Sequence, residues 1–211
     1  MHSNVLLGIH ELKTKQMSEP TQVRILAPAD AEKYREVRLQ ALHEHPPAFG
    51  SLPEDEPNLT KTAARLAQSD DQCFFGSFQG EQLAGIIRLS RYLDINEKHR
   101  AYIAGLYVLP LFRGKGCGRA LVREALNRAA EIRGIRRVNL TVGTQQEAAI
   151  KLYKSLGFEI YGTEVETFSS KGVYYDEHLM TLATISNKPK KQNKPSHHNP
   201  LPAPSRTSRD E

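Results

Sequence analysis

The segment Arg113-Gly-Lys-Gly-Cys-Gly118 has the composition of an anion-binding turn. It follows an apolar, aromatic-rich run and precedes a helical pattern over Arg119–Arg133, so a strand, a glycine-rich turn and a helix come in succession. The first N–H groups of a helix have no partner inside it, and the helix dipole adds about half a positive charge there. Glycine lets the backbone approach a ligand closely and adopt a positive φ. The cations Arg113, Lys115 and Arg119 complete a predicted phosphate or pyrophosphate site.

Two common phosphate-binding motifs do not fit this segment. The P-loop pattern Gly-x-x-x-x-Gly-Lys-Ser/Thr does not occur in the sequence. The dinucleotide pattern Gly-x-Gly-x-x-Gly fails because, counted from Gly114 or from Gly116, the third glycine position holds another residue type. The pattern that fits is Arg-x-x-Gly-x-Gly, with Arg113, Gly116 and Gly118 at its defined positions.

This pattern resembles the acyl-CoA-binding signature of the GNAT N-acetyltransferases, and the flanking sequence extends the resemblance. Residues 138–158 contain a strand pattern, a short loop, a helix with Ala-x-x-Leu-Tyr and then Gly-Phe, which is similar to a second hallmark of that family. Upstream, Gly105-Leu-Tyr-Val108 followed by Pro110 is similar to the family's fourth strand. The resemblance covers about Arg24 to Leu182, and residues 176–180 look like those of uncharacterised general members.

The resemblance implies an enzyme that moves the acetyl group of acetyl-CoA, its co-substrate, to a primary amine of a small molecule, protein or peptide. The alternative is a non-catalytic acyl-CoA-binding regulator on the same fold. In the family, the turn holds the pyrophosphate, and the backbone of a splayed strand pairs with the pantetheine arm. Carried over by position, the predicted cofactor-binding residues are Leu106, Val108, Arg113, Gly114, Lys115, Gly116, Gly118 and Arg119, with Gln146 where many relatives have asparagine.

The family's tyrosine position is occupied by Tyr153, which is predicted to protonate the leaving thiolate. The alternative for Tyr153 is a tyrosine packed on the sheet. No base is evident, because the fourth and fifth strands lack the glutamate that several relatives use. The open alternatives are His99, Tyr102, Tyr107, Asn139 and Thr141, the acidic triplet at 54–56, and residues 176–178.

The two cysteines have no zinc-like spacing, so no metal site is expected. Cys117 lies at a helix N-terminus among cations, where the pKa of a thiol falls. A role as a covalent acyl carrier is therefore an alternative for Cys117, but an apolar filler is favoured because that position in the family is usually apolar. Both cysteines fit a reducing, cytoplasmic location.

The length of 211 residues suits one domain with extended ends. Residues 1–20 are predicted to be a disordered extension, with Met17 as an alternative start, and residues 21–186 the N-acetyltransferase domain. Residues 187–211 are predicted to be a disordered, basic, proline-rich tail. The mixture of hairpins and crossover helices predicts a single-domain α/β fold with a mixed, mostly antiparallel sheet flanked by helices. The resemblance adds a splayed strand pair that holds the acyl-CoA.

Hydrophobic periodicity and turn residues predict the individual elements. Strands are expected over 22–26, 72–78, 82–92, 99–109, 136–142, 158–165 and 172–184, and helices over 30–44, 61–68, 119–133 and 146–156. Asp30 and Thr60 are the expected caps of the first two helices. In the family, the segment between these helices lies over the acceptor groove, so its acidic triplet (54–56) would favour a basic acceptor; a solvated loop is the alternative.

The net charge of +5 is unevenly distributed. The tail has six Lys/Arg against Asp210 and Glu211, whereas residues 18–186 have equal numbers of acids and bases. Eight Lys/Arg against two Glu over residues 113–137 suit a polyanionic cofactor more than a broad nucleic-acid face.

With 39% hydrophobic residues, no run approaches the ~18 apolar residues of a membrane-spanning helix. Residues 1–16 make a poor signal peptide, because they lack a basic lead-in and a long apolar core. No membrane partner is therefore expected. Many relatives form dimers, so a homodimer stays open.

Overall fold

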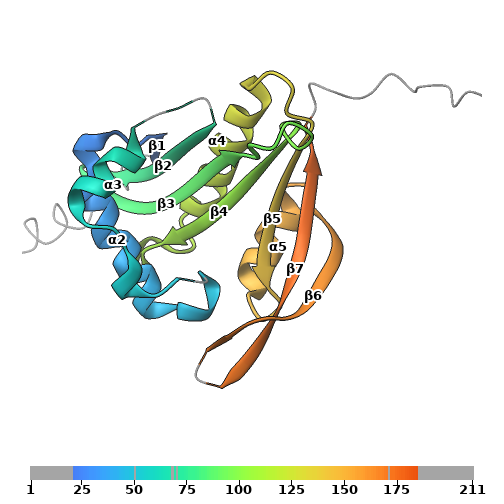
Figure 1. The fold of residues 1–211 in the computed structure, drawn as a ribbon. Coiled ribbons are helices and arrows are strands. Elements are labelled where there is room, and N and C mark those ends of the chain that lie inside the picture. Colours follow the sequence, from blue (N-terminus) through green and yellow to red (C-terminus); the bar gives the residue numbers. More distant parts are fainter. Residues whose placement is uncertain (1–20, 50, 68, 70, 171, 185–211) are drawn as a thin grey trace, which may run out of the picture.

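The computed structural model describes residues 21–184 except residues 50, 68, 70 and 171. The predicted extension (1–20) and tail (187–211) therefore lie outside the described residues. A seven-stranded sheet has the order β1-β2-β3-β4-β5-β7-β6. All neighbouring strands are antiparallel except β4 and β5, which are parallel. The predicted mixed, mostly antiparallel α/β fold is confirmed (Figure 1).

The elements follow the predicted order closely. The strands are β1 (Gln22–Ile25), β2 (Gln72–Gln79), β3 (Gln82–Arg91), β4 (Arg100–Val108), β5 (Arg137–Gly143), β6 (Glu159–Ser170) and β7 (Val173–Ala183). The helices are α2 (Ala31–Glu44), α3 (Leu59–Leu66), α4 (Cys117–Glu131) and α5 (Glu147–Ser155).

Two predicted helix starts were wrong. Helix α4 begins at Cys117 instead of Arg119, because Gly116 already serves as its N-cap with φ 87°. Helix α3 is capped by Asn58 instead of Thr60, and the Asn58 side chain accepts a hydrogen bond from the Lys61 N–H at 3.0 Å. Asparagine is among the preferred N-cap residues because its side-chain oxygen reaches an otherwise unpaired N–H.

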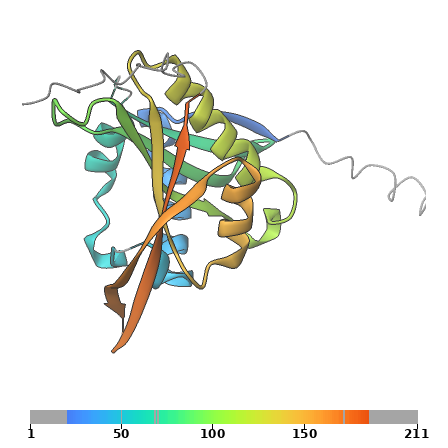
Figure 2. The ribbon, with the colours of Figure 1, turned by 90° about the vertical axis from the view of Figure 1, so that its right-hand side faces the viewer.

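Helices cover both faces of the sheet (Figure 2). Successive strand side chains point to opposite faces. Phe75 and Ile87 pack in the cluster that contains the apolar stripe of α4. Their neighbours Phe74 and Ile86 pack with Tyr34 and other residues of α2. Both faces of β2 and β3 are therefore buried, which explains their nearly continuous apolar sequences.

Strand β4 contains a bulge that the sequence did not predict. Ile86 of β3 stands opposite Tyr107, but Arg88 stands opposite Ala104, so β4 has one extra residue in this interval. Gly105 has φ +66°, which glycine adopts without strain. Such a bulge re-aims the residues that follow it. As a result Tyr107 faces α2, whereas Leu106 and Val108 pack toward the α4 side.

Strands β4 and β5 pair only over Arg100–Tyr102 and Arg137–Asn139 and then diverge (Figure 1). The Tyr102 side chain spans the beginning of this gap. Its hydroxyl lies 2.8 Å from the Thr141 hydroxyl and accepts the Thr141 backbone N–H at 3.2 Å. That N–H has lost its strand partner, and a buried unpaired N–H is costly. The splayed strand pair that the resemblance implied is thus present.

Among the described residues, no helix is long and apolar enough to cross a membrane.

Candidate functional site

A cavity of about 520 Å³ lies beside the glycine-rich turn and the diverging end of β4. Eight of the nine predicted cofactor-binding residues line it, and Lys115 does not. The Lys115 ammonium instead lies 5.4 Å from the centroid of the Phe112 ring. The eight lining residues are Leu106, Val108, Arg113, Gly114, Gly116, Gly118, Arg119 and Gln146.

The turn exposes backbone to this cavity. Gly114 and Gly116 have φ +75° and +87°, and a Cβ at either would meet no atom within 4 Å. These glycines are therefore required by backbone conformation, not by crowding within the protein. Because α4 begins at Cys117, the N–H groups of its first turn have no partner inside the helix. They present an electropositive surface to the cavity.

The strand β4 directs alternate backbone groups into the gap. The Leu109 N–H donates to the Ala84 carbonyl at 2.9 Å, so Leu109 and Tyr107 direct their backbone groups toward β3. The N–H and C=O groups of successive residues in a strand point to opposite sides. The N–H and C=O groups of Leu106 and Val108 therefore point away from β3, toward the gap. The Val108 N–H is thus placed to meet a ligand lying between β4 and β5.

Arg113, which lines this cavity, is held by a network of hydrogen bonds and an ion pair that the sequence did not predict. Its Nε donates to the Val108 carbonyl at 3.0 Å, and its Nη1 lies 2.8 Å from a carboxylate oxygen of Glu44. The Tyr107 hydroxyl donates to the other Glu44 oxygen. Arg113 and then Tyr107 hold the pKa of Glu44 below its usual range, whereas burial and Glu44 raise the pKa of Tyr107 to about 12. No local pattern links Glu44 to this turn.

Tyr153 lies in the core between α5 and the sheet, packed edge-to-face on Phe158 with ring centroids 5.8 Å apart. Burial, and then Tyr102, raise the pKa of its hydroxyl, so the phenol stays protonated at neutral pH. Tyr153 is not among the described residues that line the cavities beside it. Its role as a proton donor stays a prediction.

Cys117 is buried, and its sulfur lies 3.7 Å from the Thr21 hydroxyl. It packs with Ala84 and Phe112 in a small apolar cluster. This surrounding suits the filler role that the sequence favoured.

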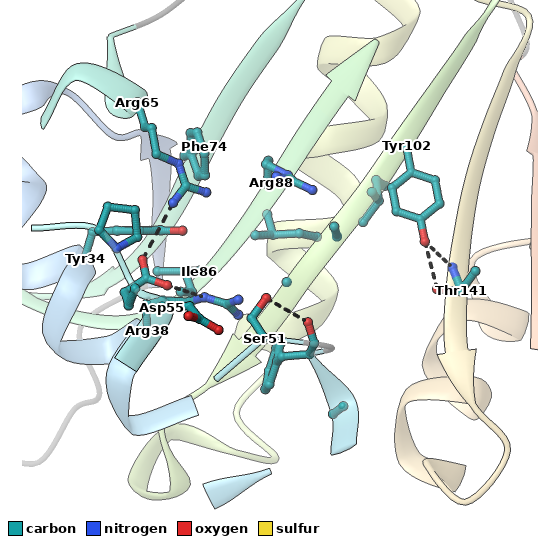
Figure 3. A pocket seen from close by; sticks show the side chains of 18 of the residues that line it. Tyr34, Arg38, Ser51, Asp55, Arg65, Phe74, Ile86, Arg88, Tyr102 and Thr141 are labelled. Atoms are coloured by element: carbon teal, nitrogen blue, oxygen red, sulfur yellow. Dashed lines mark hydrogen bonds and ion pairs between the residues drawn. The ribbon is translucent and has the colours of Figure 1, made fainter. Parts of the chain in front are cut away.

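A second cavity, of about 570 Å³, lies on the α2 and α3 face of the sheet (Figure 3). Its floor is one face of the sheet and includes Phe74, Arg88, Tyr102 and Thr141. Its other walls come from α2, the segment 48–57 and α3. Ala48 and Phe49 line both cavities. The β4 bulge lies between the two cavities, because Gly105 lines the second cavity and Leu106 lines the first. The two cavities therefore adjoin where the bulge and segment 48–57 meet.

The second cavity has three arginines and three carboxylates in its walls, namely Arg38, Arg65, Arg88, Asp55, Glu56 and Glu177. The Glu56 side chain is 4% exposed and lies 3.4 Å from Arg38 and 3.8 Å from Arg65. Asp55 is exposed. The acidic triplet therefore does not act as one negative surface, because Glu56 turns inward and neutralises arginines.

Glu177 is the one member of the 176–178 group that lines this cavity in the described structure. Burial, and more weakly the nearby Glu164, raise the pKa of Glu177, while Thr141 opposes the change. Asp176 accepts the Glu166 N–H at 2.9 Å, and His178 lies 2.9 Å from the Thr163 hydroxyl. A half-buried carboxylate with a raised pKa is a candidate proton acceptor.

Comparison with known proteins gives one consistent match. A model of the acetyltransferase (GNAT) family matches residues 38–158. The N-alpha-acetyltransferase RimI of Mycobacterium tuberculosis is 30% identical over 145 residues, which cover 69% of this chain and 82% of that protein. An uncharacterized protein of Mycobacterium leprae is 28% identical over 163 residues, or 77% of this chain, but the chain covers only 41% of that relative.

Among solved structures, a GNAT superfamily phosphinothricin acetyltransferase of Sinorhizobium meliloti in complex with AcCoA superimposes with a TM-score of 0.70 at 21% identity. The match covers 84% of this chain and 97% of that one, so the two chains share a fold over most of their lengths.

Proposed function

The chain belongs to the GNAT acetyltransferase family, and from this we propose that it transfers the acetyl group of acetyl-CoA directly to a primary amine. One observation carries the proposal: the glycine-rich turn and the backbone of the splayed strand β4 line one cavity, which adjoins a second, polar cavity. The first cavity suits a long polyanionic thioester and the second an acceptor. The cytoplasmic location and a homodimer remain predictions.

In this proposal the first turn of α4 binds the pyrophosphate through its free N–H groups, with Gly116 and Gly118 allowing close approach. Arg119 adds positive charge and is oriented by a 2.8 Å hydrogen bond to the Ser155 hydroxyl. The pantetheine arm lies along the gap and pairs with the backbone of Leu106 and Val108. Gln146 lines the same cavity and offers both an amide donor and an acceptor to that arm.

The amine nitrogen attacks the thioester carbonyl carbon, so a C–N bond forms and the C–S bond breaks. The Val108 N–H stabilises the negative charge that develops on the carbonyl oxygen. Glu177 accepts the proton that the amine loses, directly or through a water molecule. Tyr153 gives its proton to the leaving sulfur. The products are the N-acetylated amine and free coenzyme A.

The test is calorimetry of acetyl-CoA binding to the wild type and to Gly116→Glu. The substituted carboxylate enters the phosphate-binding turn, so we expect binding to be lost. Gly134→Glu is a matched control, because Gly134 also has a positive φ (+92°) but lies beyond the other end of α4. We expect Gly134→Glu to bind acetyl-CoA as the wild type does.

Amine turnover is then measured by detecting the released thiol, with Tyr153→Phe as the catalytic variant. We expect this variant to bind acetyl-CoA normally and to lose turnover. Binding without turnover of any amine would favour the non-catalytic regulator. A wild type that binds no acyl-CoA would contradict the proposal as a whole.

A further inference from the structure

The Arg88 side chain lines the second cavity without an ion-pair partner in the part of the chain that the structure describes. It projects from β3 into the middle of that cavity (Figure 3). Its Nε is buried without a hydrogen-bond partner, and no carboxylate among the described residues forms an ion pair with it. Burial, and then the nearby Arg65 and Arg38, lower the pKa of Arg88. An arginine nonetheless stays charged in proteins. A bound anion would therefore offset the desolvation cost of this guanidinium.

The neighbouring charges do not supply that anion. Arg38 and Arg65 share the single carboxylate of Glu56, so the pair is already one negative charge short. With Arg88, three arginines at this end of the cavity stand against the carboxylates of Glu56 and Asp55, which leaves an excess of one positive charge. Asp55 is exposed to solvent, so Glu56 is the only buried carboxylate among the described residues at this end. The guanidinium groups of Arg38 and Arg65 lie on the same side of Arg88 in Figure 3.

The opposite end of the cavity has a carboxylate in place of the arginines. Tyr102 and Thr141 lie there, across the floor from Arg38 (Figure 3). Glu177 pairs with Gly143, two residues from Thr141, and its side chain interacts with Thr141 on the same face of the sheet. Glu177 forms no ion pair with an arginine among the described residues. The volume of about 570 Å³ is typical of a small-molecule site. The cavity thus has an excess of positive charge at one end and the carboxylate of Glu177 at the other end.

We propose that the acceptor is a small amine that also carries a carboxylate, and that the Arg88 guanidinium binds this carboxylate while the amino group lies at the Glu177 end. The arginine fork matches a carboxylate with two parallel hydrogen bonds, which fixes orientation as well as charge. This inference rests on the proposed transferase function, whose acceptor it specifies. It replaces the basic acceptor that the acidic triplet would have favoured.

The first experiment compares L-amino acids with their own carboxamides, by ligand-observed NMR binding and by acetyl transfer. Each pair differs only in the carboxylate. We expect the acids to bind and to react with a KM lower by roughly 10- to 100-fold, the range for a hydrogen-bonded charged group. Amidation also lowers the pKa of the amine and so increases its reactive neutral form, which biases the comparison against the expected result.

The second experiment repeats the comparison with Arg88→Gln and Arg88→Lys. Arg88→Gln should lose the preference for acids through a raised KM, with the KM for carboxamides unchanged. Arg88→Lys keeps the charge without the fork and should retain part of the preference. The control is Arg123→Gln, which removes an equal charge from the exposed surface of α4 on the opposite face of the sheet. Thermal melting of each variant confirms folding.

The outcomes separate this inference from the proposed function. Acids that bind in an Arg88-dependent manner without being acetylated would support the cavity assignment while contradicting the transferase. Turnover of amines with no preference for a carboxylate, or a preference that survives Arg88→Gln, would overturn the inference and leave the transferase intact. Binding of no carboxylate in the panel would also overturn it.

Discussion

At the scale of single residues, burial acts on two proposed catalytic groups with different consequences. It raises the pKa of the Tyr153 phenol, which makes the phenol a weaker acid, and it raises the pKa of Glu177 toward neutral pH, as a proton acceptor working there requires. Tyr153 has a recognisable position in the sequence. Glu177 is one carboxylate among many until the pairing of β5 with β7 brings it opposite Gly143 and within reach of Thr141.

We expect Glu177→Gln to lower kcat by roughly 100-fold or more while acetyl-CoA binding is unchanged. A base acts in its ionised form, so wild-type activity should fall as the pH falls through the raised pKa of Glu177. The variant should lack that limb of the pH–rate profile. Asp176→Asn, which alters the adjacent carboxylate outside the cavity, is the control and should keep the limb.

Stability measurements check that Glu177→Gln acts on the reaction. A carboxyl whose pKa is raised on folding stabilises the protein below its unfolded pKa, and this contribution is lost as the pH rises through the folded value. The neutral glutamine should therefore be no less stable than the wild type at neutral pH. Unfolding at a lower denaturant concentration would assign any loss of activity to structure instead.

At the scale of elements, the sequence predicted what depends on local pattern. Hydrophobic patterns and turn residues located all seven strands and the four helices, because burial on one or both faces leaves a local signal in the sequence. The bulge at Gly105 was not predicted, since a glycine within a strand is compatible with several conformations. The placement of Arg113 by Glu44 was also missed, because it joins the end of α2 to a turn far along the chain.

The bulge leads to a prediction with a matched control. Gly105→Ala forces an L-residue to φ +66°, at a cost of about 1–2 kcal/mol in folding free energy. It should also weaken acetyl-CoA binding, because the bulge re-aims the backbone of Leu106 and Val108. Gly172→Ala imposes a similar strain (φ +77°) in the β6–β7 turn.

Denaturant unfolding and calorimetry of both variants test this. We expect both to lose similar stability and only Gly105→Ala to lose affinity for acetyl-CoA. Equal affinities in the two variants would show that the bulge does not position the cofactor-binding backbone.

At the scale of the whole molecule, the cofactor cavity was predictable and the acceptor cavity was not. Most residues of the former lie in one contiguous stretch, Leu106–Arg119, with local signals. The latter is assembled from α2, α3, segment 48–57 and strands β2 to β7, so its chemistry depends on which side chains share a face. The acidic triplet illustrates the difference: one of its three carboxylates, Glu56, is neutralised within the fold by Arg38 and Arg65.

The sheet has two parts, β1–β4 and β5–β7, joined by three residue pairs and the Tyr102 bridge. An acyl-CoA lying in the gap would pair with free backbone groups, so acetyl-CoA should slow amide hydrogen exchange in the diverging half of β4. Acetyl-CoA should also raise the free energy of unfolding by about 2.7 kcal/mol at a concentration of 100 times its Kd.

Exchange measured with and without acetyl-CoA, in the wild type and in Gly116→Glu, checks this expectation. The variant should show no protection. Protection spread evenly over α2 and α3 as well would contradict binding in the gap.

Phe49, which lines both cavities, has a consequence for kinetics. Its ring forms a T-shaped pair with the Tyr107 ring, with centroids 6.2 Å apart, and the Arg38 guanidinium lies 4.9 Å from the Phe49 centroid. A cofactor that presses on Phe49 therefore also acts on Arg38 and on the charge balance around Arg88. The two substrates should not bind independently: each should change the affinity for the other by the same factor, because thermodynamic coupling is reciprocal. Saturation with one substrate would thus set the apparent specificity for the other.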